Sequence, residues 1–372
     1  MAKKLLILIT NPDFFLSHRK EIALEAKNQG FDVHLCTMAQ ESVAEIKKMG
    51  FQHHVWKVAR TGTNPFSEFL SLISLWIILW KVRPDVFHCV TIKPVLYGGI
   101  LARLSPVKSV VSAISGVGFV FSGQKLKAKI LRVLVKPFYR FALGKKRQSI
   151  IFQNPDDRDL FYQNIGLDLD KAVLIRGSGV DLAHFCTSPE PEGKIIFTFA
   201  ARLLWDKGIG EFIDAATILL GKGMDCEFWV VGDMDEKNPE SVRPKHIQRW
   251  KAHQKIKFMG HSENMAEIFF RSHVVVLPSY REGLPKVLLE AQACARPVIT
   301  TDVPGCRDAI EEGKTGLLVP VKDAVILAAQ MEKMIERPDL RKEMGENARR
   351  LAEEAFGVEK VVAQHLDIYT SL

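Results

Sequence analysis

The sequence predicts an α/β protein built from two doubly wound parallel sheets, and three observations favour this fold class. The chain has 372 residues, whereas a single domain usually holds roughly 100–200. Short aliphatic or β-branched runs alternate with longer helical patterns, which is typical of parallel strands covered by helices on both faces. This alternation stops at one polar stretch and then begins again. The content of 47% hydrophobic and 25% charged residues excludes disordered, collagenous and disulfide-scaffold proteins.

The first half of the chain carries the first run of alternating elements. We expect its strands at 4–10, 32–37, 51–58, 85–90, 109–114, 149–152 and 172–176. We expect its helices near 17–29, 40–49, 65–82, 93–104, 125–143 and 155–165. The strand candidates are continuous apolar runs, so they predict a sheet that is buried on both faces.

The polar stretch at 186–193 contains two prolines and two acidic residues without periodicity, so it predicts a linker. After it we expect strands near 195–200, 226–231, 256–259, 273–277, 297–300 and 316–319. We expect helices near 209–221, 245–253, 264–271, 286–294, 306–311 and 323–336. These elements predict an N-terminal domain at 1–185, a C-terminal domain at 194–356, and a final helix at 357–372 that packs back on the first domain. Ligands of such proteins bind in the cleft at the carboxyl ends of the strands.

The net charge of +8 is unevenly divided along the chain. Residues 1–150 carry 23 Lys and Arg against 8 Asp and Glu, a net of +15, whereas residues 151–372 carry 28 against 35, a net of −7. No acidic residue occurs between Asp85 and Asp156. This asymmetry predicts an anionic partner for the first half.

A basic stripe lies within this acid-free interval. Its cations are spaced four, three, four and four residues apart, so they share one face of a helix: Lys125, Lys129, Arg132, Lys136 and Arg140. We expect this stripe to face an anionic membrane surface, with an ordinary solvated face as the alternative. The other side of the helix is expected in the core; it holds Leu126, Ile130, Leu134, Phe138 and Phe141. The apolar run 69–80 predicts a buried helix, with an interfacial patch as its alternative.

Other site types have little support in the sequence. The six cysteines show no C-x-x-C pair and no zinc spacing, which indicates a reduced, cytoplasmic protein. The longest uncharged apolar stretch is 69–80, shorter than the ~18 residues needed to span a bilayer, so no spanning segment is expected. Two Asp-x-Asp strings, at 168–170 and 233–235, could suggest a metal, but loop acids are common and we expect neither a metal site nor a cofactor.

The segment 279–291 is the most informative for chemistry. It leaves the apolar strand 274–277, passes through a Gly/Pro turn and opens a helix at Lys286, which predicts an anion site at a helix start. Glu282 lies in the turn and Glu290 one turn into the helix, so both carboxylates can accept hydrogen bonds from hydroxyls. Two surface carboxylates are the alternative.

A second segment, 201–208, follows the strand 195–200 and carries Arg202 and Lys207. Two cations at the carboxyl end of a strand suit a diphosphate without a metal ion. Both segments are expected at the same edge of one sheet, which favours an anion site over solvated surface charges.

With these motifs the sequence resembles the retaining nucleotide-sugar glycosyltransferases of family 4, which have the GT-B fold of two Rossmann-like domains. The resemblance covers almost the whole chain. It is carried by E-x7-E at Glu282 and Glu290, by Arg202 with Lys207, by 177–181 (G-S-G-V-D) and by 83–88 (R-P-D-V-F-H).

The resemblance implies a role for each matching residue. Arg202 and Lys207 would clamp the diphosphate, Glu282 would hold donor-sugar hydroxyls, and Glu290 would bind the ribose. Backbone groups from Gly283 through Leu284 and Pro285 to Lys286 would help to seat the sugar and phosphate. Glu282, Arg202 and Lys207 are therefore the expected catalytic residues, for transfer with retention by front-face attack and without a metal. The glycine turn at Gly116 is expected to approach a phosphate.

The sequence departs from the family at one expected contact, because Ser115 stands where many members have a histidine after the fifth strand. For the acceptor we expect contacts from Ser115, His18, Arg19 and His88. The strings 115–121, 177–181 and 64–66 resemble a sub-branch that extends undecaprenyl-diphosphate-linked sugars, which includes O-antigen enzymes and N-acetylgalactosaminyltransferases of bacterial N-glycosylation.

The expected function is therefore transfer of N-acetylgalactosamine or a related hexose from a UDP-sugar to a polyprenyl-diphosphate-linked saccharide. The first domain would bind the acceptor at the cytoplasmic face of the inner membrane, and the second the donor. Two alternatives stay open: a nucleotide-sugar epimerase on the same fold, and a non-catalytic module that binds anionic lipid. Nucleic acid is not an expected partner, because no aromatic platform for single strands is present.

Overall fold

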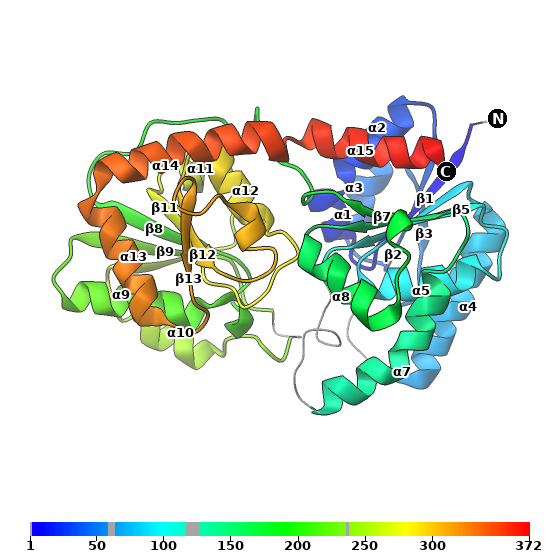
Figure 1. Ribbon diagram of the computed structural model, residues 1–372, viewed down its shortest axis with the longest axis horizontal. Helices are drawn as coiled ribbons and strands as arrows, with labels where there is room; N and C mark the ends of the chain where they lie inside the picture. The colour runs from blue at the N-terminus through cyan, green and yellow to red at the C-terminus, as the bar shows by residue number, and fades with distance from the viewer. Residues whose placement is uncertain (1, 59–63, 117–125, 236–237) are drawn as a thin grey trace. The chain divides into compact units, whose positions relative to one another are not determined.

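The computed structural model describes residues 2–58, 64–116, 126–235 and 238–372, with the side chains of 126–131 left aside. The chain divides into two compact units of similar size (Figure 1). Unit 1 comprises Met1–Ser178 with Glu359–Leu372, and unit 2 comprises Gly179–Val358. Each unit is organised around one parallel sheet with helices on it, so the predicted fold class of two Rossmann-like domains is confirmed.

The described strands of unit 1 form a seven-stranded parallel sheet in the order β3-β2-β1-β4-β5-β6-β7. Their bounds are β1 Lys4–Leu8, β2 Asp32–Thr37, β3 Gln52–Val55, β4 Val86–Val90, β5 Ser109–Ile114, β6 Gln148–Phe152 and β7 Ala172–Leu174. The order reverses between β1 and β4, which pair with Leu6 beside Phe87. The carboxyl edge of the sheet at such a reversal is the usual ligand position of doubly wound folds.

Three asparagines explain where several helices of unit 1 begin. Asn11, Asn64 and Asn154 each accept a backbone hydrogen bond at a helix start, and each is followed by proline. The helices of the unit are α1 Pro12–His18, α2 Lys20–Asn28, α3 Val43–Lys48, α4 Pro65–Val82, α5 Ile92–Ala102, α7 Leu126–Ala142 and α8 Pro155–Ile165. Because parallel crossovers are right-handed, the strand order places α4, α5 and α7 together on one face of the sheet.

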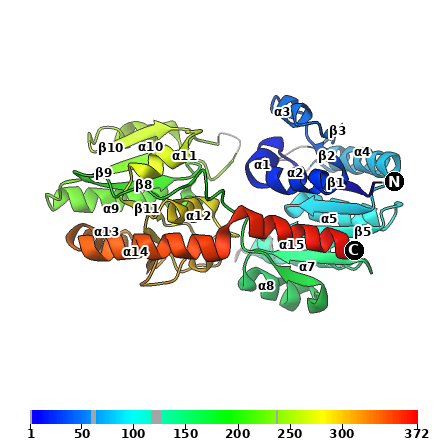
Figure 2. The ribbon, with the colours of Figure 1, turned by 90° about the horizontal axis from the view of Figure 1, so that it is seen from above.

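The C-terminal helix α15 (Val358–Ser371) runs along unit 1, where Figures 1 and 2 show it in red. Its Tyr369 is fully buried, and the Tyr369 hydroxyl lies 2.6 Å from Nδ1 of His88 in β4. This contact joins residues 281 positions apart in the sequence, so the last turns of the chain complete the core of the first unit.

Helices α4 and α7 differ from their predicted burial. The apolar side of α7 was expected in the core, but Leu134, Phe138 and Phe141 are exposed, whereas Tyr139 and Ala142 are buried. The run 69–80 was expected as a buried helix, but most of its large apolar side chains are exposed as well. By length and composition, α4 is one described helix that could cross a membrane.

The described strands of unit 2 form a six-stranded parallel sheet in the order β10-β9-β8-β11-β12-β13. The bounds are β8 Ile195–Ala200, β9 Cys226–Val231, β10 Ile256–Gly260, β11 Val274–Leu277, β12 Val298–Thr301 and β13 Gly316–Val319. The helices are α9 Ile209–Gly221, α10 Pro244–Trp250, α11 Met265–Phe270, α12 Lys286–Ala293, α13 Ala324–Glu336 and α14 Pro338–Leu351. Unit 2 also has short 3-10 helices at Trp205–Lys207 and Arg307–Ala309 and a π-helix at Ala352–Phe356, whereas the 3-10 helix Leu169–Lys171 belongs to unit 1.

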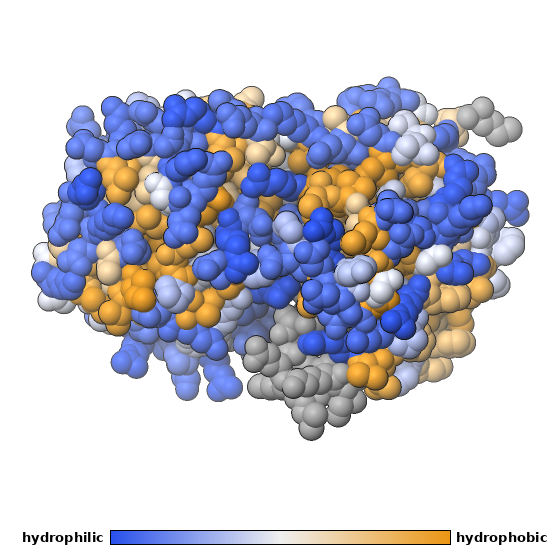
Figure 3. Space-filling model, in the orientation of Figure 1, coloured by the Kyte–Doolittle hydropathy of each residue, from blue (hydrophilic) through white to orange (hydrophobic). Residues whose placement is uncertain are grey.

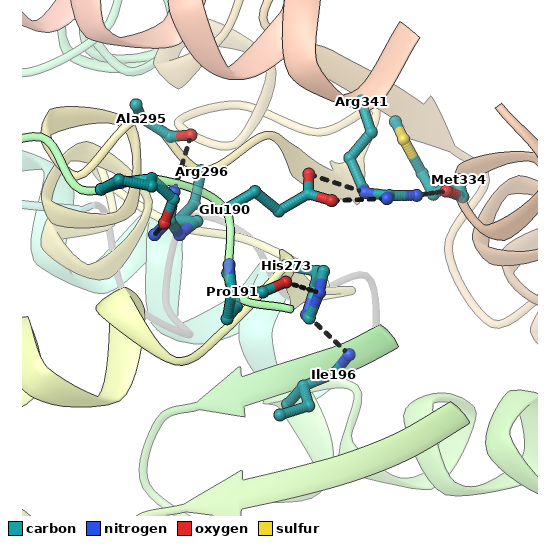
Figure 4. A network of polar contacts seen from close by, with 9 residues as sticks. Glu190, Pro191, Ile196, His273, Ala295, Arg296, Met334 and Arg341 are labelled. Atoms are coloured by element: carbon teal, nitrogen blue, oxygen red, sulfur yellow. Dashed lines mark hydrogen bonds and ion pairs between the residues drawn. The ribbon is translucent and has the colours of Figure 1, made fainter. Parts of the chain in front are cut away.

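The expected linker at 186–193 lies within unit 2, because the division falls between Ser178 and Gly179. Two buried arginines hold this segment against the unit (Figure 4). Arg341 makes a bidentate ion pair with Glu190, and Arg296 donates to the carbonyls of Ser188 and Pro189 at 3.1 and 3.0 Å. The proline- and acid-rich composition of 186–193 therefore predicts a linker, although long-range contacts hold this segment against unit 2.

Replacing the buried arginine tests this packing. Arg296→Met leaves the carbonyls of Ser188, Pro189 and Phe269 without their donor, so the free energy of unfolding should fall by about 3 kcal/mol in urea titrations. Arg243→Met, at an exposed arginine of the same unit, is the matched control and should change it by less than about 0.5 kcal/mol. Equal stability of the two variants would contradict the assignment.

Candidate active site

The two predicted anion-binding segments meet at the carboxyl edge of the unit 2 sheet. The strands β8 and β11 that precede them are neighbours. The carbonyl oxygen of Asp206 accepts a hydrogen bond from the Tyr280 backbone N–H at 2.8 Å and lies 3.1 Å from the Ser279 hydroxyl oxygen. Gly208 has a φ of 75°, and a Cβ there would lie 2.1 Å from the carbonyl oxygen of Pro278. Only glycine allows the two loops to approach this closely.

Lys207 and Glu282 form an ion pair at the centre of this site. The Lys207 Nζ lies 2.5 Å from Glu282 Oε1, and the side chains are 17% and 14% exposed. The Ser279 hydroxyl donates to the same carboxylate oxygen at 2.9 Å. The loop after β12 adds support, because the carbonyl of Pro304 accepts the Glu282 backbone N–H at 3.2 Å. Loops from three neighbouring strands thus fix one carboxylate and one ammonium that remain within reach of a ligand.

Glu290 and Lys286 form a second pair, one helical turn apart on α12. The Lys286 Nζ lies 3.2 Å from Glu290 Oε1. Burial raises the pKa of the Glu290 carboxyl, and the charge of Lys286 opposes this shift. The preceding turn is also enclosed, since Gly283, Leu284 and Pro285 are all buried. Proline has no backbone N–H, so donation from this turn is restricted to the other residues.

Arg202 lies on the same edge but is half exposed. Its Nη1 lies 2.8 Å from Oδ2 of Asp235, in the loop after β9, and the Asp235 carboxylate is 15% exposed. Asp235, from the Asp-x-Asp string at 233–235, therefore pairs with Arg202, which is predicted to bind phosphate. Within the described ranges, no group of three or more His, Cys, Asp or Glu side chains is placed to hold a metal ion.

The structure thus brings together the predicted donor-binding residues of unit 2, from both segments. Sequence reasoning missed the contacts that Ser279 and Asp235 make in the site and the close approach of Gly305, where a Cβ would lie 2.4 Å from the Glu282 carbonyl oxygen. Each missed residue follows a strand next to β8 or β11. Their position after a strand is therefore the sequence feature that could have identified these residues.

Two predicted acceptor contacts of unit 1, His88 and Arg19, have buried side chains in the structure. His88 is fully buried beside Tyr369, and its ring centroid lies 5.7 Å from that of His365. Burial lowers the pKa of His88 well below its usual value. Arg19 is 2% exposed and donates to the Ser178 hydroxyl at 2.9 Å, and burial lowers its pKa to about 10. Both residues lie buried within unit 1.

The other predicted residues of unit 1 are partly exposed. His18 is half-buried at the end of α1, stacked on Phe14 with ring centroids 4.1 Å apart. Ser115 and Gly116 follow strand β5, and Gly116 has a φ of 122°. The Ser115 hydroxyl is buried without a hydrogen-bond partner among the described residues. Ser115 and Gly116 follow a strand of the first sheet directly, and all three residues remain candidate ligand contacts.

The predicted basic stripe is only partly described. Lys125 and the side chain of Lys129 lie outside the described residues. Arg132 and Lys136 are half-buried, and Arg140 is exposed with its Nε donating to the Ile165 carbonyl at 2.6 Å.

Comparisons with known proteins agree with this geometry. The family model described as glycosyl transferases group 1 matches residues 183–351, and that described as glycosyl transferase 4-like matches residues 4–154. An N,N'-diacetylbacillosaminyl-diphospho-undecaprenol alpha-1,3-N-acetylgalactosaminyltransferase of Campylobacter jejuni is 27% identical, over 95% of this chain and 97% of its own length. A UDP-Gal:alpha-D-GlcNAc-diphosphoundecaprenol alpha-1,3-galactosyltransferase of Escherichia coli is 25% identical, over 82% and 80%.

Solved structures show the same fold. A glycosyltransferase of Rickettsia africae has a TM-score of 0.80 at 20% identity, covering 100% of this chain and 98% of its own. An Anabaena protein crystallised with UDP-glucose has a TM-score of 0.79 at 18% identity, covering 99% and 100%.

The approach of the two loops at Gly208 can be tested by adding one methyl group. Gly208→Ala should lower the free energy of unfolding by about 2 kcal/mol or more, because the new Cβ meets the Pro278 carbonyl and the backbone has a positive φ. Gly221→Ala, where no atom lies within 4 Å of the new Cβ, is the control and should be neutral or slightly stabilising. Urea unfolding measures both, and an unchanged Gly208→Ala would contradict the geometry.

Burial of two histidines predicts acid sensitivity of unit 1. Burial lowers the pKa of His365 to about 3, with the nearby Arg19 charge adding to the shift, and that of His88 also falls. Both are neutral in the folded state, so stability is complete above the unfolded pKa of about 6.5 and falls below it by about 1.4 kcal/mol per pH unit for each histidine.

The measurement is urea unfolding at pH 7 and pH 5.5. His365→Leu should reduce the loss of stability between these values by about 1 kcal/mol relative to the unsubstituted protein. The exposed His253 gives the control His253→Leu, which should leave the loss unchanged. The same pH dependence in all three proteins would contradict the buried, neutral assignment.

Proposed function

Since the chain belongs to the glycosyltransferases, we propose that it transfers a sugar from a UDP-sugar to a saccharide carried on polyprenyl diphosphate. Its first domain matches the glycosyl transferase 4-like model, and its second matches the glycosyl transferases group 1 model. The observation that carries the proposal is the Lys207–Glu282 pair at the carboxyl edge of the unit 2 sheet. The acceptor class is supported by the two relatives named for diphospho-undecaprenol sugars. The proposed sugar is N-acetylgalactosamine or a related hexose, in bacterial O-antigen assembly or N-glycosylation.

The donor roles follow from the charges at this edge. Lys207 and Arg202 bring two cations to the diphosphate, which replaces or shares their carboxylate partners Glu282 and Asp235. Glu282, fixed by Ser279, then accepts hydrogen bonds from sugar hydroxyls. Glu290 accepts from the ribose, and Lys286 holds its carboxylate in place.

The proposed reaction retains the anomeric configuration. The acceptor hydroxyl oxygen forms a bond to the anomeric carbon as the bond from that carbon to the diphosphate oxygen breaks. The proton of the hydroxyl passes to the departing phosphate oxygen, so the products are the extended lipid-linked saccharide and UDP. Lys207 and Arg202 stabilise the negative charge that develops on the leaving group, and Glu282 positions the sugar.

Unit 1 is the proposed acceptor domain. Ser115, Gly116 and His18 are its candidate contacts, and the exposed Arg140 belongs to the stripe that we assign to an anionic membrane surface. The proposed place of action is the cytoplasmic face of the inner membrane, with peripheral attachment.

The roles of Lys207 and Glu282 predict a large loss of activity. Glu282→Gln and Lys207→Ala should each lower kcat/KM by about 100- to 1,000-fold, because each removes a group that stabilises the transition state. The assay measures product mass for UDP-sugars offered with undecaprenyl-diphosphate-linked acceptors. The matched control is Lys257→Ala, which removes the similar Lys257–Glu227 pair at 2.6 Å and should change kcat/KM by less than about threefold. Activity that survives both active-site substitutions would refute the proposed site.

A further inference from the structure

Helix α4 presents an outward face made of large apolar side chains. We call this face the α4 ridge; it comprises Phe66, Phe69, Leu70, Ile73, Trp76, Ile77 and Trp80. Their spacing of three and four residues puts them on one side of the helix. They are 38–71% exposed, and no charged residue is exposed between Phe66 and Trp80. A solvent-facing helix normally carries polar residues at these positions, so the ridge needs a partner.

The opposite face of α4 fixes the helix to its unit. Leu75 and Leu79 are fully buried, and the indole N–H of the buried Trp56 donates to the Ser71 carbonyl at 2.9 Å. A helix held along one side in a folded core cannot cross a bilayer without leaving that core. The ridge is therefore suited to lie in the plane of a surface.

The apolar surface continues from α4 to α7. The indole N–H of Trp76 donates to the carbonyl of Leu104 at 3.1 Å, and Leu104 is 58% exposed just after α5. The Arg103 guanidinium lies 4.5 Å from the ring centroid of Phe141 in α7. The outward residues of α7, which we call the α7 face, are Val133, Leu134, Phe138 and Phe141. Figure 3 shows hydrophobic surface over the region where Figure 1 places α4 and α7.

Cations border this apolar surface at Trp80 and at Phe141. The exposed basic residues next to it in the sequence are Lys81, Arg83, Arg103, Arg140 and Lys146. The Arg83 guanidinium lies 6.0 Å from the ring centroid of Trp80. The acid-free interval 86–155 contains α5 and α7, so no carboxylate from these helices opposes the cations. The one acidic residue of α4, Glu68, is paired with Lys93 at 2.7 Å and accepts from the Tyr97 hydroxyl.

We propose that the α4 ridge and the α7 face dock unit 1 on an anionic lipid bilayer, with the apolar side chains in the acyl boundary and the surrounding cations at the headgroups. Tryptophans beside cations are typical of the membrane interface. A second copy of the chain would instead bring two sets of like charges together, which disfavours self-association by this face. Binding through the α4 ridge and the α7 face would differ from binding through the basic stripe alone. Salt screens the attraction of the cations to the headgroups, but it does not abolish the binding that apolar insertion supplies.

This docking deepens the proposed function, on which it rests only for the identity of the acceptor. Helix α4 begins after β3, so its Phe66 end lies at the carboxyl edge of the unit 1 sheet, where β4 and β5 also end. An acceptor diphosphate anchored in the same bilayer lies at headgroup level. Docking by the ridge therefore brings the acceptor edge and the lipid diphosphate to the same surface.

The test is binding to vesicles of phosphatidylethanolamine and phosphatidylglycerol, measured by sedimentation. The triple variant Phe66→Ser/Phe69→Ser/Ile77→Ser should bind about 1,000-fold more weakly, at roughly tenfold for each of the three exposed apolar side chains removed. The matched control is Val325→Ser/Ile326→Ser, at exposed apolar residues of α13, and should bind within twofold of the unsubstituted protein. Lys81→Glu/Arg83→Glu should weaken binding at low salt on these vesicles and not on phosphatidylcholine.

A second measurement uses the fluorescence of the protein's own tryptophans. Brominated lipids should quench the tryptophan fluorescence of the vesicle-bound protein, and Trp76→Phe/Trp80→Phe should remove most of that quenching. Vesicle binding by the triple variant equal to that of the unsubstituted protein would overturn the proposed docking face. Quenching that is unchanged in Trp76→Phe/Trp80→Phe would overturn it as well. Wild-type dimerisation at micromolar concentration that the triple variant abolishes, with vesicle binding unchanged, would assign the ridge to a second copy and refute the proposal.

The failure of docking and the failure of the proposed function give different results. The triple variant should still transfer sugar to a water-soluble acceptor with a short prenyl chain, while losing transfer to the vesicle-borne acceptor. Vesicle binding without transfer to any lipid-diphosphate acceptor would refute the function and leave the docking intact. If the unsubstituted protein transfers sugar to the soluble acceptor but does not bind vesicles, the docking is refuted and the proposed function is not.

Discussion

The contact between Lys207 and Glu282 depends on the pairing of β8 with β11, and most of the candidate site depends on that contact. Two parallel neighbours end at the same edge of the sheet, so the loops that follow them are brought together whatever their sequences. Glycine at position 208 then allows the loops to approach closely, and Asp206 joins them through its carbonyl. An ammonium and a carboxylate are thereby held at one point before any ligand arrives. This preorganisation is what transfer from a diphosphate donor requires, because the protein contributes positioning and charge.

The two units solve different electrostatic problems. Unit 2 belongs to a half of the chain with a net charge of −7, yet it concentrates Arg202, Lys207 and Lys286 at one edge, each beside a carboxylate. These pairs keep the cations in place and let a phosphate compete for them. The half that contains most of unit 1 has a net charge of +15, and its cations border an apolar surface instead of a carboxylate-lined edge. The first arrangement suits a small anion, and the second suits an extended anionic surface.

The sequence allowed the fold class and the Lys207–Glu282 site to be predicted, because both follow from local patterns and from strands that end at a common edge. Asp235 was missed because its pairing with Arg202 depends on how the loop after β9 folds. The burial of His88 depends on Tyr369, 281 residues away, which no local pattern reports. The outward face of α4 was given only as the alternative to a buried helix, because the helix is apolar on all sides and periodicity cannot tell which side packs inward. On α7 the two sides could be told apart, but part of the apolar side expected in the core faces outward.

Separate binding of UDP and of the UDP-sugar tests the central claim, that Lys207 serves the diphosphate and Glu282 the sugar, most directly. Isothermal titration of UDP and of UDP-N-acetylgalactosamine into the unsubstituted protein, Glu282→Gln and Lys207→Ala gives the contribution of the sugar as a difference in affinity. The account predicts that Glu282→Gln leaves UDP affinity within about twofold and abolishes the additional affinity due to the sugar, whereas Lys207→Ala weakens both ligands by about tenfold or more. Equal weakening of both ligands by Glu282→Gln, or no effect of Lys207→Ala on UDP, would contradict it.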